Sequence, residues 1–388
     1  MKRSILPSAA AAVGEEEEGL GSKPNPLRKF QNLARLSTAF SFDGDGVAAT
    51  NVARIHRRCI NVVRISPGPD PFVASAGLDC LLIFSRHDNG DIIRQIDTED
   101  SFVFDISISK SQYQCVVATA SQDGVVRIYD ARRHFDCIRS IKLRSEGVCP
   151  IIWAVQLFRD RFGISYFICG GANKTIHVVN WKTQQDAFIL SGHKEGVRCL
   201  AVSEDGIIAS GSNDHSVKLW NFEEQRFIQT FRGHTAEVNA LIFVPQTSYL
   251  FTACENNVFR QWNYRTGERM RVFKDYEGAS ILTLAVIPVP RKPILLVGGT
   301  VSEKAIAPLV PLQMWDIDSG TLIGCCVGTR YQISSTSTWY DSDSKSCVVV
   351  AGGLDSTIRM WHLSSGLLPL LNLGGEEDAE HEEDIFEG

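Results

Sequence analysis

The sequence predicts an all-β protein: a seven-bladed β-propeller of four-stranded blades, with flexible N- and C-terminal tails. Three observations predict this fold. Seven short segments end alike and recur at the spacing of propeller blades. Short alternating strands, separated by Gly, Asn and Asp, follow one another from residue 50 onward. An Asp or Asn recurs at one place in six of the seven units.

The repeated segments are the third strands of the expected blades. They read CLLIFS, VVRIYD, TIHVVN, SVKLWN, VFRQWN, PLQMWD and TIRMWH. Their last apolar or aromatic residues, at intervals of 45, 50, 41, 42, 53 and 46 residues, are Phe84, Tyr129, Val179, Trp220, Trp262, Trp315 and Trp361. Because a unit of this length buries its faces only against its neighbours, the repeat outweighs the two or three domains that 388 residues would otherwise suggest.

Each unit has the same order of strands and turns. In the fourth unit, strands are expected at 197–203, 207–212 and 227–233, with the Trp-ended strand before the last of them. The tight turn ahead of the Trp-ended strand carries Asp or Asn, whose side chain bonds nearby backbone. These turn residues are Asp79, Asp123, Asn173, Asp214, Asn256 and Asp355. The sixth unit departs from the pattern with an insertion, TVSEKAIAPLVP, after Gly298-Gly299.

The chain divides into four expected parts. Residues 1–26 lack periodicity and are expected to be a disordered tail, and 27–49 a short amphipathic lead-in segment. The propeller is expected over 50–374, followed by an acidic disordered tail over 375–388. The last blade needs an outer strand, which either 51–56 or 367–373 could supply. We favour 51–56, because it would tie the two ends of the ring together and cover a sheet edge.

Composition indicates an ordinary globular protein. The chain is 44% hydrophobic and 22% charged, with a net charge of −6. Eight acidic residues lie between Glu376 and Gly388, so the remainder carries +2. Nothing here calls for direct nucleic-acid binding or a membrane. The 11 cysteines form no C-x-x-C pair, which favours free thiols in an intracellular compartment, cytoplasmic or nuclear; an organellar presequence at the N-terminus is the alternative.

Motifs of catalysis are absent from the sequence. It contains no G-x-G-x-x-G, no Walker A loop, no H-E-x-x-H and no G-x-S-x-G. Asp123, Asp214 and Asp355 could suggest catalytic carboxylates, but their equivalent repeat positions indicate turn residues instead. We therefore expect no enzyme, and no catalytic, cofactor-binding or metal-binding residues.

Residues 190–221 resemble a WD-repeat, a family of propeller-forming sequences. The resemblance extends over about 50–363 and implies the fold, with little about function. In that family a His, a Ser or Thr, an Asp and a Trp form a buried hydrogen-bonded tetrad, here His193, Ser212 (or Ser210), Asp214 and Trp220. The next unit matches with His234, Thr252, Asn256 and Trp262, and the first with His56, Ser75, Asp79 and Phe84.

The loops before the first strand of each blade predict a partner surface. In this fold they share one rim with the Asp- or Asn-bearing turns. Acidic residues occupy the loops of five successive blades and basic residues the other two, with candidate contacts at Arg57, Arg58, Glu99, Asp100, Glu146, Glu195, Glu237, Glu277 and Arg330. Lys304 and Ile306 of the insertion complete the candidate surface. Such a rim would favour a basic peptide or protein segment.

We therefore expect a non-catalytic scaffold, monomeric within a larger complex, that docks other proteins. Two alternatives stay open. Receptors of cullin-RING ubiquitin ligases resemble this family but carry W-D-x-R, of which Tyr129-Asp130-Ala131-Arg132 and Trp262-Asn263-Tyr264-Arg265 are imperfect copies. A subunit of an RNA-processing complex is the second alternative.

Overall fold

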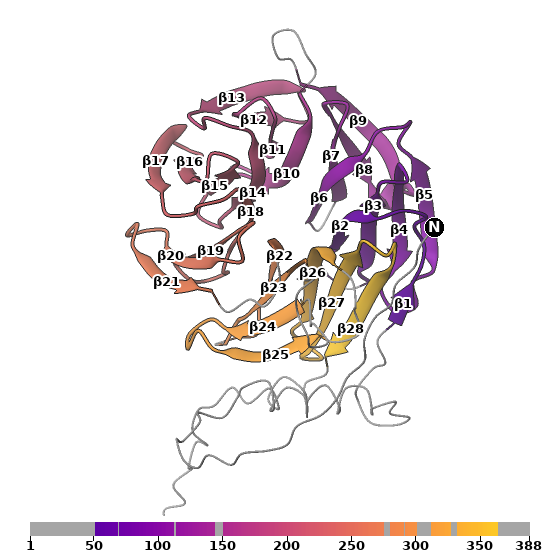
Figure 1. Cartoon of the computed structure of the whole chain (residues 1–388). Helices are drawn as coiled ribbons and strands as arrows, with labels where there is room; N and C mark the ends of the chain where they lie inside the picture. The colour runs from indigo at the N-terminus through magenta and orange to yellow at the C-terminus, as the bar shows by residue number, and fades with distance from the viewer. Residues whose placement is uncertain are drawn as a thin grey trace, which may run out of the picture. The chain divides into compact units, whose positions relative to one another are not determined.

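Seven four-stranded antiparallel sheets are arranged around a central axis (Figure 1). The computed structural model describes residues 51–68, 70–111, 114–143, 150–274, 280–290, 292–300, 312–326 and 332–363. Within these ranges the regular structure is β-strand apart from one 3-10 turn, η1 (Ala131–Arg133). The predicted fold class, an all-β seven-bladed propeller, is confirmed. Segments 1–26, 27–49 and 375–388 lie outside the described residues, as does the insertion of the sixth unit.

Blades 1 to 6 take their strands from the channel outward in chain order, and blade 7 does so for its first three strands. Blades 1 to 4 comprise β2 (Ile60–Ile65), β3 (Phe72–Gly77), β4 (Leu81–Arg86) and β5 (Ile92–Asp97); β6 (Val103–Lys110), β7 (Cys115–Ser121), β8 (Val125–Asp130) and β9 (Asp136–Lys142); β10 (Ile152–Arg159), β11 (Ser165–Gly171), β12 (Thr175–Asn180) and β13 (Gln185–Ser191); and β14 (Val197–Val202), β15 (Ile207–Ser212), β16 (Val217–Asn221) and β17 (Arg226–Phe231).

The remaining blades follow the same plan. Blades 5 to 7 comprise β18 (Val238–Phe243), β19 (Tyr249–Cys254), β20 (Phe259–Asn263) and β21 (Arg269–Phe273); β22 (Ser280–Ile287), β23 (Ile294–Thr300), β24 (Leu312–Asp316) and β25 (Leu322–Cys326); and β26 (Ile333–Asp341), β27 (Ser346–Gly353), β28 (Ile358–Leu363) and β1 (Asn51–Ala53).

The hydrophobic core lies in the seams between blades. The second strands, such as β3 and β7, are buried along their whole length, whereas the outer strands β5 and β21 are largely exposed. Each of the seven core clusters of the described residues joins two adjacent blades. Trp315 of blade 6, for example, packs edge-on against Phe259 and Phe273 of blade 5, at centroid distances of 5.2 and 5.5 Å. One blade alone would expose such a face to water.

The N-terminal strand β1 closes the ring. It pairs antiparallel with β28, so that Val52 lies opposite Arg359 and Ala53 opposite Ile358. The favoured source of the outer strand of blade 7 is therefore confirmed. Figure 1 shows this junction, where β1 lies along the outer edge of β28. A terminal strand that completes the blade at the other end of the chain couples folding of both ends.

The first strand of every blade lines the central channel and carries a bulge at its second or third residue. The register of pairing shifts there in all seven blades. The bulged residues are Asn61, Phe104, Trp153, Arg198, Asn239, Leu282 and Ser334. A bulge redirects a side chain out of the sheet pattern. These seven side chains border one cavity of about 150 Å³ in the channel.

The closing strand provides a test of ring stability. A variant lacking residues 1–53 should unfold at lower urea concentration than a variant lacking residues 1–50, which keeps β1. We expect a loss of about 1–3 kcal/mol in the free energy of unfolding, because β28 loses its hydrogen-bonded partner strand. Equal urea midpoints for the two variants would show that β1 does not stabilise the ring.

Candidate functional site

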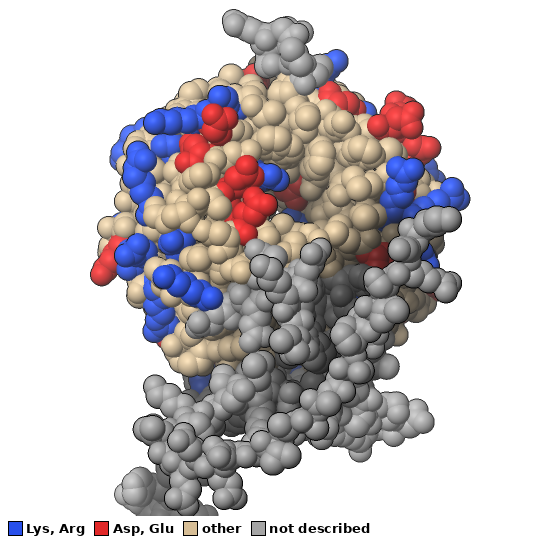
Figure 2. Space-filling model, in the orientation of Figure 1, with Lys and Arg blue, Asp and Glu red and all other residues tan. Residues whose placement is uncertain are grey.

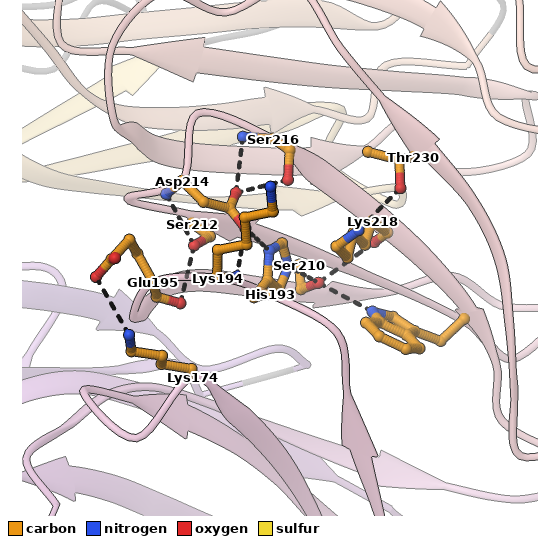
Figure 3. Close-up of polar contacts among 11 residues, drawn as sticks. Lys174, His193, Lys194, Glu195, Ser210, Ser212, Asp214, Ser216, Lys218 and Thr230 are labelled. Atoms are coloured by element: carbon orange, nitrogen blue, oxygen red, sulfur yellow. Dashed lines mark hydrogen bonds and ion pairs between the residues drawn. The ribbon is translucent and has the colours of Figure 1, made fainter.

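A hydrogen-bonded network in blade 4 links the turn after β15 to β16 (Figure 3). His193 Nδ1 lies 2.8 Å from Asp214 Oδ2, and His193 Nε2 lies 2.8 Å from Ser210 Oγ. The indole Nε1 of Trp220 donates to the same hydroxyl at 2.9 Å. All four side chains are largely buried, so each polar atom needs the partner that it has.

The assignment of Ser212 to this network is wrong. Ser212 Oγ donates to the backbone oxygen of Glu195 at 3.1 Å and accepts from the backbone N–H of Asp214. Trp220 pairs with Ile208 across the sheet, so Ser210, two residues farther along the same face, is the hydroxyl within reach of the indole. The register relative to the turn could have identified it, because the hydroxyl residue lies four positions before the turn residue in blades 1, 4 and 5.

Blade 5 has a different network. His234 Nε2 and Trp262 Nε1 both lie near Thr252 Oγ1, at 2.8 and 2.9 Å. Asn256 does not contact His234; its amide bonds Thr235 and accepts from Cys254. The expectation that Asn256 joins the tetrad is therefore wrong. In this blade a cation, and not a carboxylate, lies beside the imidazole.

That cation is Arg260. Its Nη1 lies 2.6 Å from His234 Nδ1, and its Nη2 donates to the backbone oxygen of Gly233 at 2.7 Å. Arginine only donates, so Nδ1 of His234 accepts and the imidazole proton sits on Nε2. Sequence reasoning missed Arg260. A signal was present: Arg also stands four residues after the turn residue in blades 2 and 7, where Arg127 and Arg359 bond their turn Asp.

Blade 1 holds a network without the indole. His56 Nδ1 lies 3.0 Å from both carboxylate oxygens of Asp79, and its Nε2 lies 2.8 Å from Ser75 Oγ. Phe84 takes the place of Trp and is fully buried. Phenylalanine has no N–H to satisfy, so the hydroxyl of Ser75 needs one partner fewer than its counterpart in blade 4.

The buried networks shift the ionisation of their members. Burial lowers the pKa of His56, which the hydrogen bond to Asp79 opposes in part. Burial and the Arg260 guanidinium lower the pKa of His234 to about 3. For Asp214, burial alone would raise the pKa, but hydrogen bonds from His193 and Ser216 hold it below its usual range. His234 is therefore neutral at neutral pH, and Asp214 is ionised.

The mouth of the channel presents a group of side chains from blades 3 to 5. Trp153 lies flat beside Gly196, where any side chain would collide with its ring, and the Arg198 guanidinium lies 5.6 Å from its centroid. Arg198 also bonds Asn213 Oδ1 at 3.0 Å and Glu237 at 2.7 Å. Figure 2 shows acidic side chains gathered beside the central opening, next to β14 and β18.

Comparison with known proteins supports the repeat assignment. The family model "WD domain, G-beta repeat" matches residues 78–130, 184–221 and 225–263. The chain carries WD40 repeats. The matched segments include the Trp-ended strands of blades 4 and 5, and their polar networks are those described above.

Three curated proteins illustrate the range of similarity. Periodic tryptophan protein 2 homolog from Caenorhabditis elegans is 23% identical over 63% of this chain and 25% of its own length. Nuclear distribution protein nudF from Emericella nidulans is 25% identical over 48% of this chain and 45% of its own. Guanine nucleotide-binding protein subunit beta-1 from Drosophila melanogaster is 30% identical over 36% and 40%. The chain thus matches less than half the length of each. WD40 repeats generally bind other proteins and are generally non-catalytic.

Of the predicted rim residues that the structure describes, two glutamates are paired with cations. Glu195 pairs with Lys174 at 3.7 Å, and Glu237 with Arg198, so neighbouring blades supply cations to both. Glu99 and Asp100 are exposed on the loop before β6, and Arg57 and Arg58 are exposed before β2. Glu146, Glu277, Lys304, Ile306 and Arg330 lie outside the described residues.

Neither a metal cluster nor a membrane span occurs in the described part of the chain. No group of three His, Cys, Asp or Glu side chains there could hold a metal ion. No helix there is long and apolar enough to cross a membrane. The buried His and Asp side chains of the WD40 repeats bond one another and the strands that carry them.

The blade 4 network can be tested by a double-mutant cycle. Ser210→Ala should lower the free energy of unfolding by about 1–3 kcal/mol, because His193 Nε2 and Trp220 Nε1 lose their shared partner. In a Trp220→Phe background the same change should cost less by at least about 0.5 kcal/mol. Ser212→Ala is the matched control and should show no such coupling with Trp220→Phe. Coupling to Ser212 instead of Ser210 would contradict the network.

His234 makes a second prediction, on pH. Its pKa is about 3 in the folded protein and about 6.5 when unfolded, so between these values the unfolded chain binds more protons. Stability should therefore fall as pH drops from 6.5, by up to about 1.4 kcal/mol per pH unit from this group. Urea unfolding of His234→Gln at pH 6.5, 5.5 and 4.5 should give a slope shallower by about one proton. An unchanged slope would exclude His234 as the source.

Proposed function

We propose that this chain is a non-catalytic scaffold that docks protein partners of a larger complex through the rim of its propeller. One observation carries the proposal: the seven bulged positions at the channel are structurally equivalent, yet their side chains differ in size and polarity. They include two aromatic rings, Phe104 and Trp153, and Leu282, all only partly buried. Aromatic side chains at a partly exposed, polar-rimmed site are typical of protein interfaces.

The preferred partner at this mouth is a basic peptide segment. The side chain of Glu195 is 58% exposed and that of Glu237 is 33% exposed, and Glu237 pairs with Arg198, which lies over the Trp153 ring. Their present ion pairs with Lys174 and Arg198 are surface pairs, which contribute little to stability. An incoming Lys or Arg can replace them at small cost and can also lie over an aromatic ring, as Arg198 does now.

The chain is proposed to act inside the cell, as one copy within a hetero-complex. Nine cysteines of the described residues are free, and burial raises the pKa of thiols such as Cys347, to about 12. Unpaired, protonated thiols are typical of reducing compartments.

No specific observation in the described residues favours either alternative, the ubiquitin-ligase receptor or the RNA-processing subunit. In the ligase-receptor reading Arg265 would be a partner contact, but it already bonds Asp205 of blade 4 at 3.1 Å. Asp130 accepts the backbone N–H of Arg132 as the cap of η1. Both alternatives stay predictions from sequence.

The proposal is tested by affinity purification and mass spectrometry of three variants. Trp153→Ala and Glu237→Lys should each lose partners that the native chain recovers, while the melting temperature stays within a few degrees. Phe162→Ala is the control, because Phe162 is 75% exposed on the same blade, in the β10–β11 turn at the opposite end of the channel. Full partner recovery by Trp153→Ala, or the same losses with Phe162→Ala, would exclude the channel mouth.

A further inference from the structure

Arg260 is a buried cation without a carboxylate. It is 8% exposed, and the groups that it contacts are the neutral His234, the backbone oxygen of Gly233 and the thiol of Cys254, none of which is a carboxylate. Its Nε has no hydrogen-bond partner among the described residues. Burial lowers the pKa of this guanidinium, the neighbouring Cys254 side chain opposes that shift, and the charge of Arg269 lowers the pKa further. A buried charge is costly unless an opposite charge compensates it.

The equivalent arginines of two other blades show what is missing. Arg127 Nη2 lies 2.7 Å from the carboxylate of Asp123, and Arg359 Nη2 lies 2.5 Å from that of Asp355. In both blades the carboxylate stands four residues before the arginine. In blade 5 that position is Asn256, which bonds Thr235 instead. The same architecture therefore leaves one of three arginines uncompensated within the described residues.

A second arginine approaches the same place. A Cβ built on Gly233 would lie 3.7 Å from Arg260 Nε and 3.6 Å from Arg269 Nη1, and no other described atom comes within 4 Å apart from Gly233's own neighbours. Gly233 has φ +134, which only glycine adopts easily, so no side chain fills this space. Two guanidinium groups from blade 5 thus approach the same point beside Gly233, at the seam with blade 4.

Other basic residues lie in the adjoining chain segment and on the neighbouring strand of blade 4. Arg232 precedes Gly233 in the chain and is exposed. Burial lowers the pKa of Lys218 on the neighbouring strand of blade 4, and Arg232 and Lys194 lower it further against the opposing effect of Asp214. Figure 2 shows Lys and Arg side chains gathered along the outer edge over β17, β20 and β21. The basic seam, defined as Arg232, Arg260 and Arg269, is distinct from the channel mouth.

We propose that the basic seam binds a phosphorylated Ser or Thr carried by a segment of a partner protein. A phosphate monoester brings a charge of about −1.5 to −2 and three acceptor oxygens, which match several convergent guanidinium donors better than a single carboxylate does. The bound phosphate supplies Arg260 with the negative charge that Asp123 and Asp355 supply in blades 2 and 7. This site docks an acidic group, whereas the channel mouth is proposed to dock a basic one.

Capture on immobilised degenerate peptide libraries tests the proposal with the full chain. Three libraries are compared at equal ionic strength, with phosphoserine, serine or glutamate at the fixed position. We expect at least about tenfold more capture by phosphoserine than by either other library. Equal capture by glutamate would overturn phosphate recognition in favour of a carboxylate partner. Stronger capture by single-stranded RNA than by phosphoserine would overturn a protein partner.

Two variants and two controls locate the site. Arg269→Gln and Asn256→Asp should each reduce phosphoserine capture by about tenfold; the second does so by giving Arg260 an internal carboxylate. Arg226→Gln removes an equal charge from β17, where Arg226 already pairs with Glu224, and should change capture by less than about twofold. Trp153→Ala should leave it unchanged, which separates this site from the channel mouth. An equal loss with Arg226→Gln, or none with Arg269→Gln, would overturn the proposal.

Asn256→Asp also has a readout independent of ligand. An ion pair like those of Arg127 and Arg359 should raise the urea midpoint of unfolding. A raised midpoint together with unchanged phosphoserine capture would exclude Arg260 from the site. If this variant does not fold, Arg269→Gln against Arg226→Gln decides the matter alone.

Discussion

Burial of one blade's face against the next is the constraint on which the rest of this structure depends. In six of the seven blades an aromatic side chain lies near the end of the third strand and packs against a neighbouring blade, as for Trp262 stacked on Phe231 at 4.7 Å. The chain therefore has to close a ring, and closure needs β1 on the edge of β28. Three residues from one end of the propeller complete the sheet that begins at the other end. Both ends therefore belong to one cooperative folding unit.

Within that ring, the polar positions tolerate exchange as long as hydrogen bonds and charge balance. Blade 4 solves the balance with imidazole and carboxylate, and blade 2 with guanidinium and carboxylate. Blade 5 retains both the imidazole and the guanidinium but has lost the carboxylate. The blades can therefore be compared with one another at two equivalent positions, four residues before and four residues after the turn residue. The comparison shows which polar partner each buried side chain has in each blade.

The repeat explains how far the sequence could be interpreted. Blade number, strand order and the closing strand were predictable, because they follow from the period and from covering a sheet edge. Ser210 and Ser212 could not be separated by alternation, since residues two apart face the same side of a strand. The role of Arg260 was not predicted, because a charged residue in a strand is expected to be exposed to solvent. Here its side chain is buried between blades. The bulges, and hence Trp153 at the channel mouth, depend on register that only the paired strands reveal.

The blades differ most at positions outside the packed core. These positions form two regions of opposite charge, the channel mouth and the basic seam. At the channel mouth, bulged side chains meet acidic loops whose ion pairs are exposed and weak. At the seam of blades 4 and 5, Gly233 has a positive φ and no side chain. Two guanidinium groups approach the point where a side chain would begin. A ring built from equivalent units can differ in function only through such departures. The absent carboxylate at Asn256 is a departure that leaves a charge inside the protein and not at its surface, and a charge is costly to bury.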